Sequence, residues 1–233
     1  MRIITPAEIE RVAWDGYLEP LGQTFKSAAL RPRVTLGEPV WWPAAQAMEN
    51  ETGKEWVPPV SDRRYTLLRL ACTLHPLADP HARYDAATLT LYLRPRRNSA
   101  AGPVVAHDIY PRRLSAERQT KFDVGLGPDL KFAQLFEASL FGIGAEIEYR
   151  QVFPVIQGYG LGESRPYWQF AHHESNPLLG SQSVYAVLDA PPDSGGVRLS
   201  VEMVATLQTR FGPLRVGLPE EARAHLSRVI EET

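Results

Sequence analysis

The stretch VRLSVEMVATLQTR, residues 197–210, alternates apolar and polar side chains over most of its length. Apolar side chains stand at every odd position from Val197 to Leu207, and only Val204 interrupts the polar series between them. Successive side chains of a β-strand point to opposite faces of the sheet. This spacing therefore predicts a strand with one face in a core and the other in water, as in an antiparallel sheet.

Other runs in the chain carry weaker forms of the same signal. Residues 64–74 have apolar side chains on both faces, as a covered strand does, and residues 88–94 alternate leucine with threonine and tyrosine. The turn-forming cluster 190–196 leads us to expect that 182–189 and 197–210 pair as an antiparallel hairpin. We expect 64–74 and 88–94 to form a second hairpin with a long connection. Further strand candidates are 103–109, 119–125, 130–140, 144–157 and 182–189.

The two ends of the chain carry helix signals instead. Thr5 and Glu8 stand at the spacing of a capping box, which predicts a short helix within 5–18. Pro219, followed by two glutamates and apolar residues at helical spacing, predicts a second helix over 219–232.

These elements predict a single domain over residues 1–233. The fold class is mainly β, an antiparallel β-sandwich of Ig-like or jelly-roll-like type, with about eight strands and short N- and C-terminal helices. Residues 1–62 contribute the first helix and a Pro- and Trp-rich segment that wraps the core. Residues 63–212 form the strand core, and 219–232 form the last helix.

The composition narrows the class of protein. The chain has 233 residues, 44% hydrophobic and 22% charged, which is typical of a globular protein. Cys72 is its one cysteine and cannot close an intramolecular disulfide, and we expect it to act as a small apolar residue in mid-strand. No signal peptide and no apolar stretch of about eighteen residues is found. We therefore expect a cytoplasmic protein without cofactors or membrane contact.

The formal net charge of −2 hides an uneven distribution of charge. Residues 1–62 carry a net charge of −3, residues 63–121 carry +7 and residues 122–233 carry −6. The middle third could bind a small anion, since Arg forks suit phosphate and carboxylate groups. The alternative is neutralisation by acids of the last third, among them Glu146, Glu148 and Glu202. Nucleic acid is an improbable partner because domains that bind it are usually basic overall.

The segment 157–170, QGYGLGESRPYWQF, is rich in glycine and aromatic residues. Its alternate glycines do not make a dinucleotide-binding loop, because no helix pattern follows them. One interpretation is a flexible loop that presents aromatic side chains to a partner, with Glu163 and Arg165 as polar anchors. The other is that the glycines form a bulge or turn and the aromatics close one end of the sandwich. The same alternatives hold for Trp41, Trp42 and Trp56.

Catalytic and metal-binding motifs are weak. The sequence lacks the nucleophile elbow and the phosphate-binding loop. Two groups of side chains could still serve a metal or acid–base site. The first is the loop with His75, Asp79 and His81, and the second is His172 and His173 with Glu163 upstream. His107 beside Asp108 could be an oriented imidazole, but the sequence offers no third partner for it.

We favour a non-enzymatic module that binds a protein partner, or further copies of itself, through the aromatic Gly-rich loop. One alternative is a metal-assisted hydrolase or other small-molecule enzyme that uses the His and Glu loop residues. Another is a sensor or carrier of a small anionic ligand. The expected binding residues are Tyr159, Glu163, Arg165, Tyr167, Trp168, Phe170, Arg96, Arg97, Arg112 and Arg113.

Overall fold

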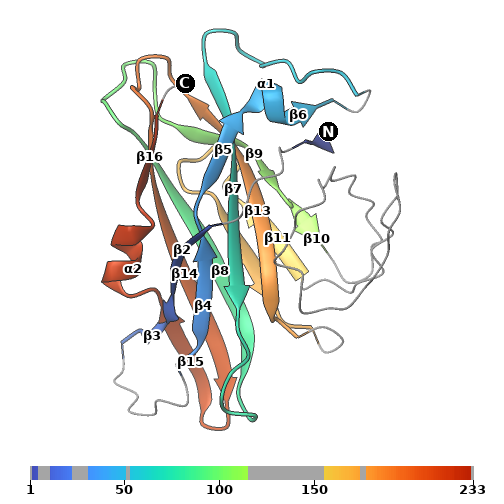
Figure 1. Ribbon diagram of the computed structural model, residues 1–233, viewed down its shortest axis with the longest axis vertical. Helices are drawn as coiled ribbons and strands as arrows, with labels where there is room; N and C mark the ends of the chain where they lie inside the picture. The colour runs from blue at the N-terminus through green and yellow to red at the C-terminus, as the bar shows by residue number, and fades with distance from the viewer. Residues whose placement is uncertain are drawn as a thin grey trace.

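The fold is an antiparallel β-sandwich, as the alternating pattern predicts (Figure 1). The computed structural model describes residues 2–4, 11–22, 31–50, 53–114, 155–173 and 177–231. An eight-stranded sheet and a six-stranded sheet form the two layers, and a two-stranded sheet lies beside them. The described residues form sixteen strands, more than the eight or so expected, since several strands have only two or three residues.

The eight-stranded sheet has the strand order β10 (Arg113–Leu114), β11 (Val155–Tyr159), β12 (Tyr167–Ala171), β8 (Arg83–Pro95), β14 (Val197–Thr209), β15 (Gly212–Gly217) and β3 (Glu19–Pro20), with β16 (Arg228–Ile230) paired to β14. The six-stranded sheet has the order β2 (Val12–Tyr17), β4 (Arg33–Gly37), β7 (Arg64–Leu74), β13 (Gly180–Ala190) and β9 (Val105–Tyr110), with β5 (Val40–Pro43) paired to β7. The small sheet pairs β1 (Arg2–Ile3) with β6 (Met48–Glu49).

The predicted hairpin of 182–189 with 197–210 is wrong. Both segments are strands, but β13 pairs with β7 and β9, whereas β14 pairs with β8, β15 and β16 in the other sheet. The turn between them crosses from one sheet to the other and is fixed to the loop after β8. There the Arg96 N–H donates to the Gly196 carbonyl at 2.9 Å, and the Arg97 N–H donates to the Ser194 carbonyl at 2.8 Å.

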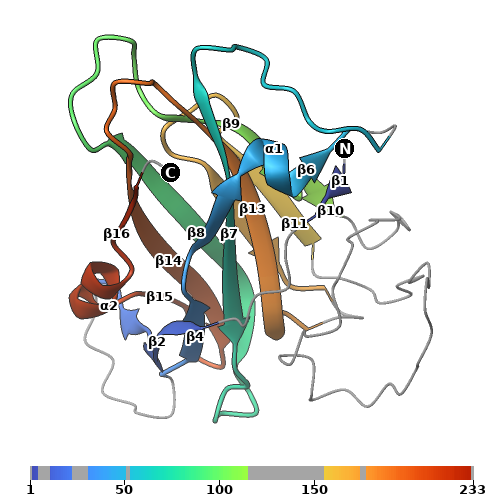
Figure 2. The same cartoon turned by 45° about the horizontal axis from the view of Figure 1, so that its top comes forward.

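The second predicted hairpin fails for the same reason. Strands β7 and β8, which cover 64–74 and 88–94, lie in different sheets, and so do β8 and β9. Figure 2 shows β8 and β14 in one layer and β7 and β13 in the other. The connections β7–β8, β8–β9 and β13–β14 therefore pass from one sheet to the other rather than turning back within one sheet.

The helix predictions need two corrections. Strand β2 occupies 12–17 and pairs with β4, so the predicted helix does not continue there; residues 5–10 lie outside the described residues. The C-terminal helix is present but short. Helix α2 (Glu220–His225) ends where β16 pairs with β14, since strand pairing overrides the helical spacing of 226–230. A short helix, α1 (Ala44–Ala47), was not predicted.

Three further strand candidates fall largely on residues that are not described. The candidates 119–125 and 130–140 lie outside the described residues, as does most of 144–157, whose last three positions coincide with the start of β11. The candidate 103–109 corresponds to β9.

The main core lies between the two sheets. The odd-numbered residues of β14 from Val197 to Leu207 are buried in it, as expected, and Cys72 is buried there with 1% of its surface exposed. A second apolar cluster on the outer side of the six-stranded sheet contains Trp42, Tyr65 and Leu67. Figure 2 shows α1 and β6 beside the N-terminal strand β1.

The tryptophans of the Pro-rich segment belong to these clusters. Trp42 is buried, and Trp41 and Trp56 are partly buried and packed against the main core and the second cluster, respectively. The interpretation that they cover the core is therefore the better one. Among the described residues, no helix is long and apolar enough to cross a membrane.

Candidate functional site

The outer face of the eight-stranded sheet carries a row of side chains across four strands. Tyr159 of β11 lies opposite Tyr167 of β12, which lies opposite Thr90 of β8, which lies opposite Glu202 of β14. The two tyrosine rings are stacked, with centroids 4.9 Å apart and planes 16° from parallel. The Tyr159 hydroxyl donates to Gln157 Oε1 at 2.5 Å, which fixes the position of the outer ring.

A second aromatic ring stands beside this row. Tyr92 is two residues after Thr90 on the same face of β8, and its hydroxyl donates to Glu202 Oε2 at 2.5 Å. The guanidinium carbon of Arg165 lies 4.9 Å from the centre of the Tyr92 ring, which is a cation–π contact. Burial, followed by the hydrogen bond to Glu202, raises the pKa of Tyr92. We call the surface formed by Tyr92, Tyr159, Arg165, Tyr167 and Glu202 the tyrosine face.

The loop 160–166 between β11 and β12 is held by main-chain hydrogen bonds to both sheets. The Leu91 and Leu93 N–H groups of β8 donate to the carbonyls of Pro166 and Ser164, each at 2.9 Å. On the other sheet, the Ala106 N–H donates to the Glu163 carbonyl at 2.9 Å, and the Gly162 N–H donates to the Ala106 carbonyl at 2.7 Å. The expectation of a flexible loop is not supported by these bonds, which tie it to β8 and β9.

The glycines of this segment are explained by close packing of the main chain. Gly160 has φ +84°, and a Cβ there would lie 2.8 Å from Pro166 Cα. A Cβ on Gly158 would lie 2.8 Å from the Pro111 carbonyl oxygen. The turn interpretation of the glycines is therefore the better one, and the turn brings Arg165 over Tyr92.

Trp168 and Phe170 are not available to a partner in this structure. Both side chains are fully buried in the main core. Neighbours along a strand point to opposite faces, so Tyr167 faces outward while Trp168 faces inward. The expectation that all four aromatics form one binding surface is thus wrong for these two, which close the core. Tyr159 keeps 38% of its surface exposed, and Leu161 in the loop keeps 50%.

An open groove of about 530 Å³ adjoins the tyrosine face. Tyr92, Ser200 and Glu202 line it from the strands, and Glu220, Arg223 and Ser227 line it from α2 and the residues that follow. Its hydroxyl and charged groups suit a polar ligand. This groove could not be predicted from the sequence, because Tyr92 and Glu202 are 110 residues apart and meet only through the pairing of β8 with β14.

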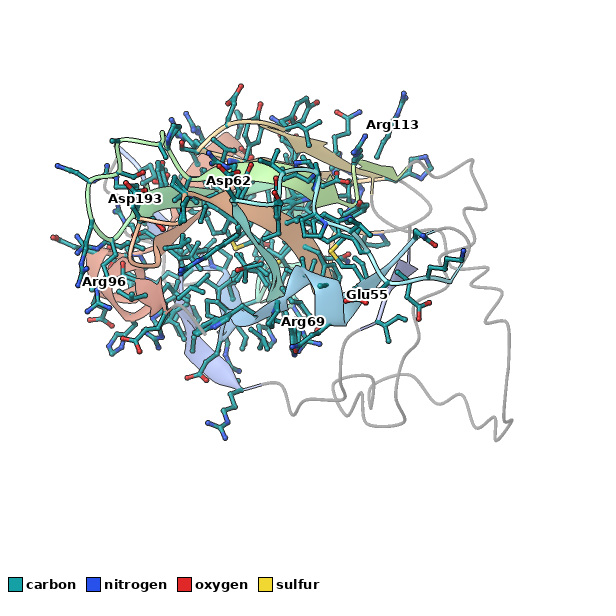
Figure 3. The ribbon with its side chains drawn as sticks, turned by 90° about the horizontal axis from the view of Figure 1, so that it is seen from above. Glu55, Asp62, Arg69, Arg96, Arg113 and Asp193 are labelled. Atoms are coloured by element: carbon teal, nitrogen blue, oxygen red, sulfur yellow. The ribbon has the colours of Figure 1, made fainter. Side chains whose placement is uncertain are left out.

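The two predicted arginine clusters lie apart and are partly neutralised. Figure 3 shows Arg96 and Arg113 on opposite sides of the molecule. Arg96 forms an ion pair with Glu231 at 3.5 Å, and Arg112 forms one with Asp108 at 2.7 Å. Arg97 is exposed and packs its side chain against Gly195, and Arg113 is exposed in β10. These four residues do not form one anion site.

Neutralisation by the last third of the chain holds in part. Glu231 pairs with Arg96 and Asp189 pairs with Arg63, both across large sequence separations. Glu202 accepts a hydrogen bond from Tyr92, and Glu146 and Glu148 lie outside the described residues.

The histidines do not converge on one cleft. His75 Nε2 lies 2.7 Å from the Thr35 hydroxyl, and Asp79 accepts a hydrogen bond from the His81 N–H within its own turn at 2.9 Å. His107 packs edge-on against Tyr65, with ring centroids 5.3 Å apart. In the described part of the chain, no group of three or more His, Cys, Asp or Glu side chains could hold a metal ion.

Glu163 and His172 stand at opposite ends of β12. Glu163 belongs to the loop before this strand, whereas the His172 N–H, after it, donates to the Asp85 carbonyl at 2.9 Å. Five strand residues at about 3.3 Å each lie between the two ends. They therefore do not form the acid–base site considered for the enzyme alternative.

Asp15 belongs to a surface network that should make the free energy of unfolding depend on pH. Arg33 pairs with Asp15, and the Thr35 hydroxyl donates to the same carboxylate at 3.0 Å. The bond from Arg33 holds the pKa of Asp15 below its ordinary value of 3.8. This contribution to stability is present above about pH 4 and is lost as pH falls through the folded pKa. Urea melts should show less acid destabilisation in Asp15→Asn than in the wild type; identical pH profiles would contradict this.

Comparisons with solved structures find low similarities. Clostridium perfringens delta-toxin has 13% identity and a TM-score of 0.39, over 92% of this chain and 93% of that chain. The Clostridium perfringens NetB toxin in its membrane-inserted form has 9% identity and a TM-score of 0.35, over 92% and 98%. A structure described as a pore forming protein has 8% identity and a TM-score of 0.37, over 94% and 92%.

No protein-family model matches the sequence, and a search among curated proteins finds no match. Identities and TM-scores as low as those of the solved structures carry no argument about the function of this chain.

Proposed function

We propose that this protein is a non-enzymatic binding module that recognises a protein partner through its tyrosine face. The observation that carries the proposal is the stacked pair Tyr159 and Tyr167 beside the Arg165–Tyr92 contact. The two tyrosines flank the loop 160–166, which carries Arg165 and is hydrogen-bonded to both sheets. Tyrosine and arginine are enriched among the residues that dominate protein–protein binding energy. Side chains already held in place lose less conformational entropy on binding.

The shape of this region also suits a protein partner. The exposed Tyr159 and Leu161 stand at the loop, and the groove lined by Glu202, Glu220 and Arg223 lies alongside. An aromatic centre with polar groups around it is the usual arrangement of a protein interface. A partner that fits would bring apolar side chains to the tyrosines and polar ones to the groove.

The test is affinity capture from the native lysate with the wild type and a Tyr159→Ala/Tyr167→Ala double variant. The matched control is Tyr17→Ala, because Tyr17 is an exposed tyrosine, 55% accessible, on the other sheet. We expect the wild type and the control to retain the same partner, and the double variant to bind it at least about tenfold more weakly, a loss of about 1.4 kcal/mol.

Self-association is tested on the same three proteins. Sedimentation at increasing concentration would show whether the wild type forms oligomers that the double variant does not. Equal capture by all three proteins, together with unchanged sedimentation, would contradict a role of the tyrosine face in binding.

A further inference from the structure

Two arginines lie directly opposite each other on the outer face of the eight-stranded sheet. Arg94 of β8 and Arg198 of β14 are register partners. The pair Tyr92 and Ser200 lies two residues away along each strand, on the same face. Opposite residues on antiparallel strands have Cβ atoms only about 4.5–5.5 Å apart, and like charges in that position are destabilising. The pair thus has an energetic cost in the free protein.

Nothing among the described residues neutralises this pair. Neither Arg94 nor Arg198 takes part in an ion pair within that part of the chain, and the residue beyond Arg198 in the row is Val229 of β16. Other arginines of the molecule do have acidic partners. These pairs are Arg33–Asp15, Arg63–Asp189, Arg96–Glu231 and Arg112–Asp108.

Arg94 and Arg198 line a small groove on this face of the sheet. It has a volume of about 200 Å³ and is lined by Tyr92, Arg94, Arg198 and Ser200. This is below the range of about 300–1,000 Å³ that is usual for drug-sized ligands, so it suits one small charged group. Arg165, over the Tyr92 ring, adds a third positive charge nearby, while Glu202 lies on the far side of Ser200 along β14.

We infer that Arg94 and Arg198 form a binding subsite for a phosphate group, either free or as a monoester. Planar guanidinium forks donate paired hydrogen bonds to tetrahedral oxyanions, and a dianion between the two arginines replaces their repulsion with attraction. Ser200, whose hydroxyl oxygen lies 3.2 Å from that of Ser227, also lines this groove. This inference goes beyond the protein-binding function proposed above, and its test uses different residues and a different ligand.

The test is a titration with inorganic phosphate at constant ionic strength, followed by isothermal calorimetry and by the thermal unfolding midpoint. The wild type should bind phosphate saturably, and its midpoint should rise with concentration. Arg94→Gln and Arg198→Gln should each lower the affinity by about tenfold, as expected for the loss of one charge-assisted contact. Arg83→Gln is the matched control, since exposed Arg83 lies opposite Gln208 in the same two strands, and should bind like the wild type.

A second measurement separates binding from a structural role of these arginines. Without phosphate and at low salt, Arg94→Gln should raise the unfolding midpoint, because it removes the repulsion from Arg198. Glycerol phosphate in place of inorganic phosphate shows whether the subsite takes the esterified group. The inference is overturned if chloride at the same ionic strength produces the same shift as phosphate, or if Arg94→Gln and Arg198→Gln bind phosphate as the wild type does.

Discussion

Replacing Trp168 with alanine is expected to lower the free energy of unfolding by about 3–5 kcal/mol. The side chain is fully buried, and in the sheet it lies between Gly158 of β11 and Leu89 of β8. Gly158 has no side chain that could move into the space, so the cavity cannot close from that side. Urea denaturation followed by far-UV circular dichroism would measure the loss.

Two further variants test the reason for this loss. Trp168→Phe should cost clearly less than the alanine change, because it keeps most of the buried ring and the Trp168 indole N–H has no hydrogen-bond partner among the described residues. Tyr159→Ala, on the neighbouring strand but exposed, should change stability by no more than about 1 kcal/mol. A Trp168→Ala protein as stable as Tyr159→Ala would show that the indole is not a core side chain.

The contrast between Tyr167 and Trp168 shows which features of the site could be predicted from the sequence. Alternation indicates that Tyr167 and Trp168 face opposite sides of a strand. It does not indicate which of the two is inside, because both are large and partly apolar. The register of β12 with β8 determines which side chain is buried. Trp168 lies opposite Leu89 on the inner face of the sheet, and Tyr167 lies opposite Thr90 on the outer face.

Which strands share a sheet could not be predicted from the sequence for a related reason. The alternation in 197–210 correctly predicts a strand with a buried face, and β14 has it. A buried face on each of two successive strands is satisfied equally by a hairpin and by two facing sheets. The cluster 190–196 serves the second arrangement, since β13 before it and β14 after it lie in different sheets.

The two sites proposed here depend on this long-range pairing. Arg94 and Arg198, like Tyr92 and Glu202, come from strands more than one hundred residues apart in sequence and meet only in the β8–β14 ladder. The sequence located the basic third and the aromatic loop. From the basic third, the sequence pattern indicated Arg96 and Arg97 as binding residues, and these lie beyond the end of β8. It did not indicate Arg94, which lies within β8 and is paired with Arg198.

Replacing Gly160 with alanine should destabilise the loop 160–166 far more than the same change at Gly162. Both glycines have positive φ, +84° and +77°, which costs a residue with a Cβ about 1–2 kcal/mol. At Gly162 nothing lies within 4 Å of the added atom. At Gly160 it would lie 2.8 Å from Pro166 Cα and 2.9 Å from the Arg165 carbonyl oxygen, which are main-chain atoms and cannot rotate away.

We therefore expect Gly162→Ala to lower the free energy of unfolding by about 1–2 kcal/mol and to leave partner binding unchanged. Gly160→Ala should cost more than this, because the main chain at Pro166 must move and the hydrogen bond from the Leu91 N–H must weaken. That movement displaces Arg165 from Tyr92, so Gly160→Ala should also weaken capture of the partner. Urea denaturation and the capture assay measure the two effects, and equal behaviour of the two variants would show that the close approach at Gly160 does not hold the tyrosine face in place.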